Sequence, residues 1–318
     1  MQEFTIGKNE AGQRLDKYLG RILKEAPVSF FYKMMRKKNI VLNGAKCTGK
    51  EQLAVGDSVK LFLSDETIEK FGGSKNVQDI SRAYPYKKLD IVYEDDDVIF
   101  VNKPSGMLTQ KAAPGDISLN EYIIGYLLHE NKLDEAQLRT FKPSVCNRLD
   151  RNTSGLVLAG KSMQGSRELS LMIKERTLDK FYLTVVKGRV PHDSSVCGLL
   201  IKDETSNKVS VRPLEADTVA ESDERYIRTD YHVLGYGEDY TVLEVHLITG
   251  RPHQIRAHLA VLGHPVLGDF KYGDRRINEK YKLKDQLLHA FRIVLPDGRE
   301  YQAKVPHRLG EFIDSINM

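Results

Sequence analysis

The sequence predicts a protein of two domains that combine helices and strands, the larger of the α/β or α+β class, and three observations support this. The chain has 318 residues, which is long for a single hydrophobic core. Helical spacing of apolar residues and short apolar runs of strand length occur in both parts of the chain. Between residues 64 and 88 the chain is polar, contains Gly72 and Gly73, and lacks apolar periodicity. We therefore expect a small α+β domain at residues 1–65, a linker at 66–88 and a larger domain at 89–318.

Composition narrows the class of protein. Hydrophobic residues make up 41% of the chain and charged residues 29%, with a net charge of +4, which is ordinary for a globular protein. The cysteines Cys47, Cys146 and Cys197 have no paired spacing, so neither a disulfide framework nor a zinc knuckle is expected. The N-terminus lacks a signal-peptide pattern, and no apolar run reaches the ~18 residues of a membrane span. We expect a cytoplasmic protein with no membrane contact and no cofactor.

The N-terminal region is predicted to hold two helices and a small sheet. Apolar residues recur at helical spacing over residues 15–23, and a second helix follows Pro27. Residues 40–42 read as a strand, and Asn43-Gly44 is typical of a hairpin turn. Alternating apolar residues at 59–61 predict a further strand.

A cluster of cations marks the end of the second predicted helix. Its members are Lys33, Arg36, Lys37 and Lys38. Cations at a helix C-terminus suit the helix dipole and can simply face solvent. In a compact basic module, the same cluster could instead contact RNA phosphates without reading sequence. The residues alone leave both interpretations open.

The larger region is predicted to contain both strands and helices. Strands at residues 89–93 and 98–101 flank the acidic segment 94–97, which we interpret as a solvated hairpin turn rather than a metal site. Apolar periodicity also predicts the following elements: helices at residues 119–127, at 163–175 and after Pro252, and strands at 156–159, 180–186, 241–247 and 287–295.

One loop in this region places a carboxylate between two guanidinium groups. Asp150 lies between Arg148 and Arg151, and the polar turn that follows ends at Gly155, before an apolar run of strand length. Loops on rigid scaffolds often carry chemistry. Asp150 is either an ordinary surface residue or a carboxylate kept ionised by a nearby arginine, ready to act as a nucleophile or base.

The segment Arg148 to Gly155 resembles the signature of the RluA-type RNA pseudouridine synthases. Four further segments occur in the family's order: 101–107, 180–182, 247–273 and 287–290. The N-terminal region more weakly resembles the alpha-L RNA-binding module. Together these resemblances imply a mixed or antiparallel sheet in the catalytic domain and an RNA-binding N-terminal domain. They raise the expectation that the cation cluster binds RNA.

The resemblance implies three catalytic residues. Asp150 is the family's catalytic carboxylate. Tyr182, which alternation separates from Phe181 and Leu183 on its strand, matches the active-site tyrosine whose ring packs against the target base. Arg256, three residues after His253 on a predicted helix, matches the arginine that pairs with the catalytic aspartate.

Further residues are expected to contact RNA. By resemblance, Arg148 can occupy the space of a flipped base, Lys103 borders the cleft and Leu288 lines the uridine pocket, while Arg251 and His253 approach the same cleft. The chain departs from the family at Asn147, where histidine is common, and at Gln110-Lys111, where a His-Pro pair is usual. Both departures leave the details of substrate contact open.

The expected activity is isomerisation of uridine to pseudouridine, most naturally in large-subunit ribosomal RNA, by a monomer. A transfer RNA substrate is a second option. A catalytically silent RNA-binding or ribosome-assembly protein is the main alternative, and an N-glycoside hydrolase is another, although such hydrolysis generally uses two placed carboxylates. The four histidines between 246 and 264 lack the spacing of a metal motif, so no metal is expected.

Overall fold

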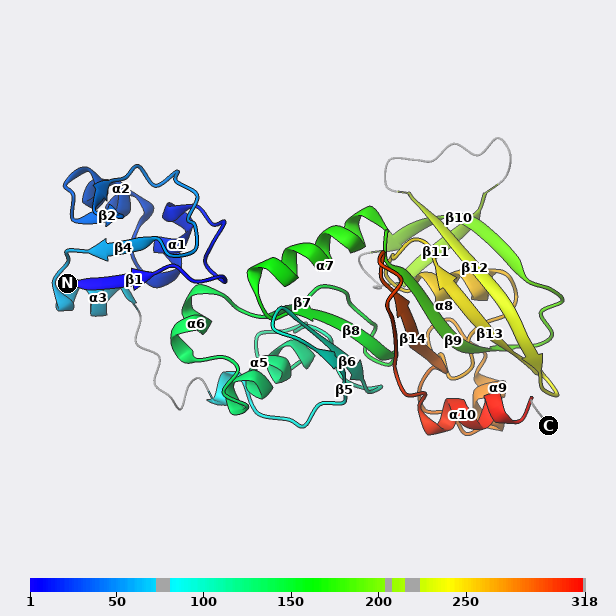
Figure 1. Cartoon of the computed structure of the whole chain (residues 1–318). Helices are drawn as coiled ribbons and strands as arrows, with labels where there is room; N and C mark the ends of the chain where they lie inside the picture. The colour runs from blue at the N-terminus through cyan, green and yellow to red at the C-terminus, as the bar shows by residue number, and fades with distance from the viewer. Residues whose placement is uncertain (73–80, 204–207, 215–223, 317–318) are drawn as a thin grey trace.

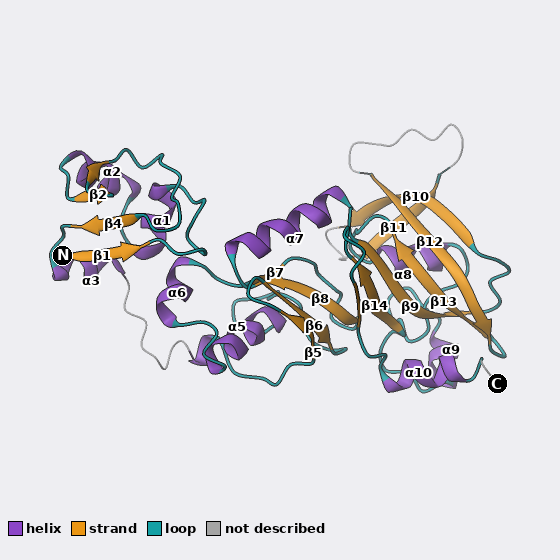
Figure 2. Cartoon of the chain, in the orientation of Figure 1, coloured by secondary structure: helices purple, strands orange, loops and turns teal. Residues whose placement is uncertain are grey.

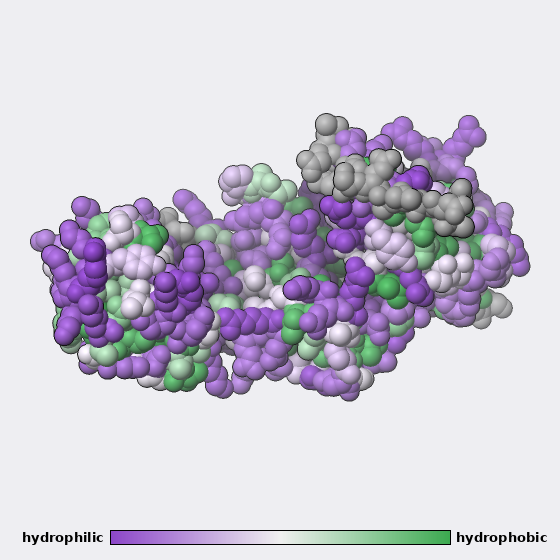
Figure 3. All heavy atoms as spheres, turned by 90° about the horizontal axis from the view of Figure 1, so that it is seen from above, coloured by the Kyte–Doolittle hydropathy of each residue, from purple (hydrophilic) through white to green (hydrophobic). Residues whose placement is uncertain are grey.

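The molecule is elongated, with the N-terminal domain at one end and the C-terminal half of the larger domain at the other (Figure 1). The structure is a computed structural model that describes residues 1–72, 81–203, 208–214 and 224–316. Figure 2 shows helices on both sides of the larger sheet. Seen from above, most of the surface is hydrophilic, with small separated hydrophobic areas (Figure 3). Of the helices described, none is long and apolar enough to cross a membrane.

The N-terminal domain packs its helices against a small antiparallel sheet with the strand order β1-β4-β2-β3. The predicted helices and strands are confirmed, and Asn43 and Gly44 form the β2–β3 turn with positive φ angles of 51° and 74°. The elements are β1 (Gln2–Thr5), α1 (Leu15–Ile22), α2 (Val28–Arg36), β2 (Ile40–Leu42), β3 (Ala45–Lys46), β4 (Ser58–Leu61) and α3 (Asp65–Gly72).

The linker prediction was wrong for residues 66–72. These residues belong to α3, and Ile68 is buried in the same core as Leu15 and Phe31. The sequence signal was weak because this helix has only 8 residues and contributes little more than Ile68 and Phe71 to the core. So short a helix shows almost no apolar periodicity. Residues 73–80, also expected to be linker, lie outside the described part of the chain.

The larger domain is built on a mixed sheet, which confirms the α+β class. Within the described residues this sheet has 11 strands in the order β11-β10-β12-β13-β9-β14-β8-β6-β5, with β15 beside β14 and β7 beside β8. All pairings are antiparallel except β14 with β8. The strands are β5 (Ile91–Glu94), β6 (Val98–Lys103), β7 (Ser144–Val145), β8 (Ser154–Gly160), β9 (Asp179–Lys187), β10 (Ser194–Asp203), β11 (Lys208–Pro213), β12 (Arg225–Tyr236), β13 (Tyr240–Leu247), β14 (Leu288–Val294) and β15 (Glu300–Gln302).

Helices cover both faces of this sheet. On one face, α5 and α8 pack into the core that contains Tyr182 and Leu288. On the other face, α7 packs on the β6 and β8 half, and α9 and α10 pack on the β9 and β13 half. The helices are α5 (Leu119–His129), α6 (Glu135–Thr140), α7 (Met163–Glu175), α8 (Gln254–Val261), α9 (Arg275–Lys280) and α10 (His307–Asp314).

The two domains touch at α6 and α7. Arg21 of α1 donates to the carbonyl of Thr140 at 2.6 Å, and the Thr140 hydroxyl donates to Glu10 at 2.5 Å. Arg167 of α7 donates to the carbonyl of Gly12 at 2.8 Å. These contacts fix the orientation of the N-terminal domain relative to the sheet that carries the site.

Candidate active site

The loop that carries Asp150 is held from both sides. Leu149 is buried. Its amide donates a hydrogen bond to the Thr109 hydroxyl at 3.2 Å, and that hydroxyl donates one to the Leu149 carbonyl at 2.8 Å. After Asp150 the chain turns, and the amide of Thr153 donates to the carbonyl of Asp150 at 3.0 Å. Gln286 in turn donates to the Thr153 hydroxyl at 2.5 Å. The backbone at Asp150 is therefore fixed before any substrate arrives.

Asn147, one of the departures from the family pattern, has a structural role. Its side-chain amide donates to the carbonyl of Leu156 at 3.2 Å, and its side-chain oxygen accepts from the amide of Leu158 at 2.8 Å. The side chain therefore fastens the start of the loop to β8, the strand into which the end of the loop runs. Gln110 and Lys111, the other departure, are exposed.

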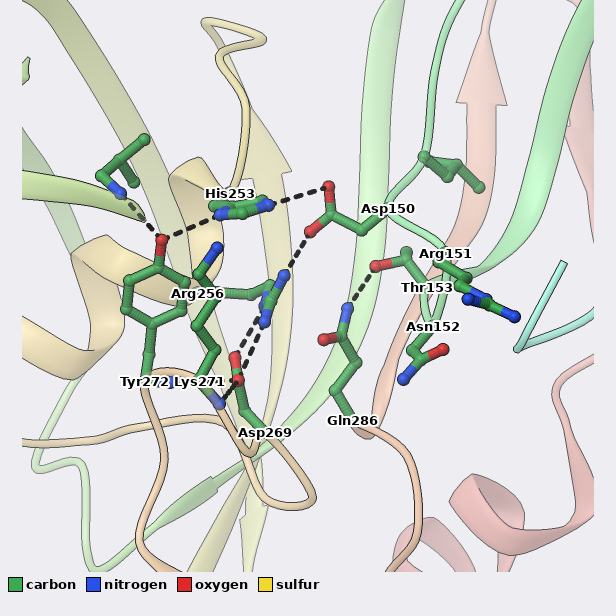
Figure 4. A network of polar contacts seen from close by, with 12 residues as sticks. Asp150, Arg151, Asn152, Thr153, His253, Arg256, Asp269, Lys271, Tyr272 and Gln286 are labelled. Carbon is green, nitrogen blue, oxygen red and sulfur yellow. Dashed lines mark hydrogen bonds and ion pairs between the residues drawn. The ribbon is translucent and has the colours of Figure 1, made fainter. Parts of the chain in front are cut away.

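Asp150 and Arg256 form the predicted ion pair. Arg256 Nη1 lies 2.7 Å from Asp150 Oδ2, and Figure 4 shows the carboxylate reaching from its loop toward α8. The same guanidinium binds Asp269 with two hydrogen bonds, from Nε at 2.6 Å and from Nη2 at 2.9 Å. The Asp269 side chain is fully buried, whereas that of Asp150 is 26% exposed. Of the three charged groups, the Asp150 carboxylate is thus the one that substrate can approach.

Arg256 and Asp269 keep each other charged despite their burial. Burial disfavours a charged Arg256, but Asp269 and Asp150 outweigh burial and raise the pKa of the guanidinium. Burial likewise opposes ionisation of Asp269, yet Arg256 and the amides of Lys271 and Tyr272 lower its pKa. Asp269 also accepts hydrogen bonds from these two amides at 2.8 and 3.1 Å. Arg256 is therefore a permanent cation at a fixed position beside Asp150.

His253 lies next to Asp150 but does not supply its counter-charge. Its Nε2 is 3.9 Å from Asp150 Oδ1, and its Nδ1 is 2.8 Å from the Tyr272 hydroxyl. Burial is the main cause that lowers the pKa of His253, and it outweighs the attraction of Asp150. The imidazole is therefore neutral at pH 7, with one edge facing the carboxylate. Its backbone has a φ of 54° at the N-cap of α8, an uncommon conformation for a residue other than glycine.

Tyr182 lies on β9, on the face of the sheet that holds Leu288 and α8. The alternation predicted from the sequence is confirmed, because Leu183 and Val185 pack into the core on the opposite face. Only 7% of Tyr182 is exposed, and its hydroxyl has no hydrogen-bond partner among the described residues. Burial, with a smaller contribution from the negative charge of Asp150, raises the pKa of its phenol. The phenol is therefore protonated at neutral pH and lies near Asp150.

Lys103, which the sequence predicts to contact RNA, is buried beneath the Asp150 loop. Its side chain is fully buried, and its Nζ donates to the carbonyls of Pro104, Met107 and Arg151 at 2.9, 2.9 and 3.0 Å. Burial lowers the pKa of Lys103 to about 8. The ammonium joins the turn after β6 to the Asp150 loop, because it binds backbone carbonyls of both. Without it, these three carbonyls would lack a hydrogen-bond donor.

The other predicted RNA-binding residues differ in exposure. Arg148 and Arg251 are exposed, as are the four cations Lys33, Arg36, Lys37 and Lys38 at the end of α2. Leu288 is buried, at 5% exposure. It lines a cavity of about 750 Å³ that includes neither Asp150 nor Arg256.

The four histidines in and around α8 act singly. Within the described residues, no group of three or more potential metal ligands is found. Each histidine has its own partner: His246 with Asp179, His253 with Tyr272, His258 with Thr229 and His264 with the carbonyl of Lys187.

Sequence reasoning missed Asp269, Tyr272 and Gln286, which hold Arg256, His253 and the Asp150 loop. Residues 267–273 read as ordinary turn chemistry, and Gln286 stood outside every motif. The available signal was weak: an acidic residue in a turn that directly follows the helix of Arg256. Nothing in local spacing shows that this carboxylate folds back under the guanidinium.

Comparisons with known proteins identify the fold and the family of the chain. The fold resembles that of human RNA pseudouridylate synthase domain containing 4, with a TM-score of 0.58 and 20% identity, covering 71% of this chain and 92% of that chain. It also resembles human RNA pseudouridylate synthase domain containing 1, with a TM-score of 0.53 and 21% identity, covering 72% of this chain and 95% of that chain. The chain belongs to the RNA pseudouridylate synthase family, whose model matches residues 97–261. It is therefore an isomerase that acts on RNA.

Similar proteins from bacteria match almost the whole chain. The ribosomal large subunit pseudouridine synthase C of Vibrio parahaemolyticus is 32% identical over 92% of this chain and 88% of its own length. That of Haemophilus influenzae is 32% identical over 91% and 85%. An uncharacterized RNA pseudouridine synthase of Bacillus subtilis is 27% identical over 99% and 97%.

Proposed function

We propose that this enzyme converts specific uridines of large-subunit ribosomal RNA to pseudouridine, with Asp150 as the catalytic carboxylate. One observation carries the assignment of Asp150. It is the partly exposed end of a chain of charges whose other members, Arg256 and Asp269, are buried. Burying charges is costly unless function or precise pairing compensates. The names of the bacterial relatives support the choice of RNA substrate.

The reaction breaks the bond from N1 of uracil to C1′ of the ribose, turns the base and forms a bond from C5 to C1′. The C5 proton leaves and N1 gains one, so no redox step is needed and no cofactor is proposed. Asp150 acts at the sugar of the target nucleotide. Arg256 orients the carboxylate, because the other edge of its guanidinium is fixed by Asp269.

Tyr182 is proposed as the platform for the uracil ring. It is rigidly packed in the sheet on the face of Leu288, and aromatic faces stack readily on bases. Its raised phenol pKa supports contact through the ring and a donated hydrogen bond rather than through a phenolate.

The target uridine must leave its stack to reach Asp150, so we propose base flipping. Arg148, exposed two residues before Asp150, is proposed to fill the vacated space. Arg148→Ala should then lose more activity on structured RNA than on single strands. Equal loss on both substrates would contradict this role.

The exposed cations of α2 are proposed to bind RNA phosphates at a distance from the site. They lie on the domain that α6 and α7 orient, so the N-terminal domain would add affinity without touching the target base. We further propose that the enzyme works as a monomer in the cytoplasm.

The decisive experiment measures tritium release from C5 of labelled uridine in large-subunit ribosomal RNA. The wild type should release tritium, and Asp150→Asn, which keeps the shape but removes the charge, should not. Asp150→Ala tests the same point without the amide. Circular dichroism of each variant checks that the fold is intact.

Other outcomes separate the alternatives. RNA binding without release by the wild type would favour a silent binding protein. Free uracil in the reaction would favour a hydrolase. Release by Asp150→Asn at the wild-type rate would remove Asp150 from the chemistry.

A further inference from the structure

The cavity of about 750 Å³ lies beside the Asp150 loop and is lined by Ser154 and by four segments that are distant in sequence. These segments are residues 87–90, 102–105 with Met107, 282–288 and 304–309. The cavity therefore lies where the edge of β5 and β6 meets the segments before β14 and α10. Its volume falls in the range of ligand-binding cavities, ~300–1,000 Å³.

The floor of the cavity is apolar. Leu89, Met107, Leu283 and Leu287 line it together with Leu288. Leu283, Leu287 and Leu288 are buried, and the other two are partly buried. Such a surface suits the flat face of a base or the carbon skeleton of a ribose.

The rim of the cavity is positively charged. Lys88, Lys282, Lys284 and Lys304 line it and are exposed, and among the described residues none of these lysines has an ion-pair partner. We call the cavity with these four lysines the basic groove. Its charge is not neutralised from elsewhere in the fold, which indicates an anionic occupant.

The two acidic residues that line the groove offset only part of this charge, because four lysines stand against two carboxylates. Asp90 accepts a hydrogen bond from the side chain of Asn102 at 2.9 Å. Asp285 acts electrostatically on the buried ammonium of Lys103. Arg308, also in the lining, pairs with Glu311 and donates to the carbonyl of Tyr281 at 2.6 Å, so it is not counted among the free cations of the rim.

The groove is continuous with the catalytic loop. Gln286 lines it and donates to Thr153. Ser105, also in the lining, donates to the carbonyl of Asn152 at 3.0 Å. A nucleotide in the groove would therefore be separated from the Asp150 site by one turn of backbone, residues 151–153.

We propose that the basic groove binds the nucleotides of the RNA substrate that flank the target uridine, with phosphates at the four lysines and bases or sugars on the apolar floor. This inference rests on the proposed RNA isomerisation, which brings a polyanion to the adjacent site. Positive grooves with surfaces for bases are the general means of holding single-stranded nucleic acid. A free nucleotide or an acidic protein segment would match the charge but not the continuity with the Asp150 loop.

The first test reverses two charges of the rim. Lys282→Glu/Lys284→Glu is compared with Arg275→Glu/Arg276→Glu, which makes the same change in net charge on exposed residues of α9 outside the groove. For a transcript of large-subunit ribosomal RNA, the groove variant should raise KM at least ~10-fold with kcat little changed. For RNA binding by the same variant, the magnitude of the slope of log K against log salt concentration should also fall by ~1.4, because two phosphate contacts on a single strand are lost. Equal effects of both double variants would overturn the proposal.

The second test locates the bound nucleotides independently of catalysis. A photo-crosslinking amino acid replaces Lys304 in Asp150→Asn, and the same replacement of Arg276 is the control. Reverse transcription should place the crosslink at Lys304 within a few nucleotides of a modified uridine, and Arg276 should give no such site. Crosslinks scattered over the RNA, or to a ribosomal protein in assembling subunits, would overturn the proposal. A localised RNA crosslink with no pseudouridine formed by the wild type would retain the groove and refute the proposed reaction.

Discussion

Arg256 is the residue on which the electrostatics of the site depend. One guanidinium edge binds the buried Asp269 and the remaining nitrogen binds Asp150. Because the planar fork of arginine fixes both directions at once, Asp269 determines where the charge beside Asp150 lies. Asp269 is thus a positioning residue that acts through Arg256.

Asp269→Asn should lower kcat ~100-fold while KM changes little, because the guanidinium loses its orientation beside Asp150. Removing one partner of a buried pair should also reduce the free energy of unfolding by ~3–5 kcal/mol. Tritium release and urea unfolding measure the two effects. Asp274→Asn is a suitable control, since Asp274 is a less buried aspartate in the same turn region that pairs with Lys187 instead. Wild-type kcat in Asp269→Asn would contradict the positioning role.

Two buried histidines link stability to pH. Burial lowers the pKa of His258 and of His289 to about 4, against about 6.5 in an unfolded chain. Between pH 6.5 and 4 the unfolded chain binds protons that the folded chain refuses, so stability falls as the pH falls through this window. Between pH 7 and pH 5 the expected loss is ~1–2 kcal/mol per histidine.

The variant His258→Gln should therefore show a smaller difference in unfolding free energy between pH 7 and pH 5 than the wild type. His192→Gln changes an exposed histidine and should leave that difference unaltered. Denaturant unfolding at both pH values measures it. The same pH dependence in wild type and His258→Gln would remove His258 as a cause.

At the scale of elements, the junction of β8 and β14 positions the Asp150 loop. Asp150 precedes β8 by a short turn, and β8 pairs with β14 in parallel through Ser154 and Gly155. Gly155 has a φ of 113°, and a Cβ there would lie 2.2 Å from the carbonyl oxygen of Ala290. The glycine that ends the motif is thus required by the close approach of two strands.

Gly155→Ala should destabilise the protein by ~2–5 kcal/mol, because it adds both backbone strain and a backbone clash. Gly106→Ala is the matched control, since Gly106 also has a positive φ, 83°, but nothing lies within 4 Å of the added Cβ. Its cost should be limited to about 1 kcal/mol of strain. Thermal unfolding of both variants tests the difference, and equal costs would show that the contact with Ala290 relaxes freely.

At the scale of the whole molecule, positive charge lies both far from the site and next to it. The exposed cations at the end of α2 belong to one domain, and the exposed Arg148, two residues before Asp150, belongs to the other together with the exposed Arg251. Contacts of Arg21 and Arg167 across the domain boundary hold the two sets in one orientation. An RNA that spans both domains would gain affinity from α2 and specificity from the site.

Arg36→Glu should therefore weaken RNA binding and raise KM several-fold with kcat unchanged, and it should reduce the salt slope of binding by ~0.7–0.9. The comparison variant is Lys174→Glu, which makes the same charge change on the exposed end of α7. Filter binding at several salt concentrations gives both slopes. A fall in kcat without a change in KM would place Arg36 in a different role.

The sequence by itself determined the class of the fold, the family and the ion pair of Asp150 with Arg256. Local chemistry carries that information: the spacing of apolar residues, the turn at Asn43-Gly44 and the motif around Asp150 are all contained in short segments. Even the pairing of Asp150 with Arg256 was accessible, although only through resemblance, since 106 residues separate them.

Only the tertiary structure decided which charges are buried and what each one holds. Lys103 read as a cleft cation but lies under the loop, bound to three carbonyls, and Asp269 read as a turn residue but anchors Arg256. The helix of residues 65–72 was also hidden, because its stability comes from packing on a core formed by other segments. Burial and ion pairing depend on residues that are distant along the chain, and no local pattern records them.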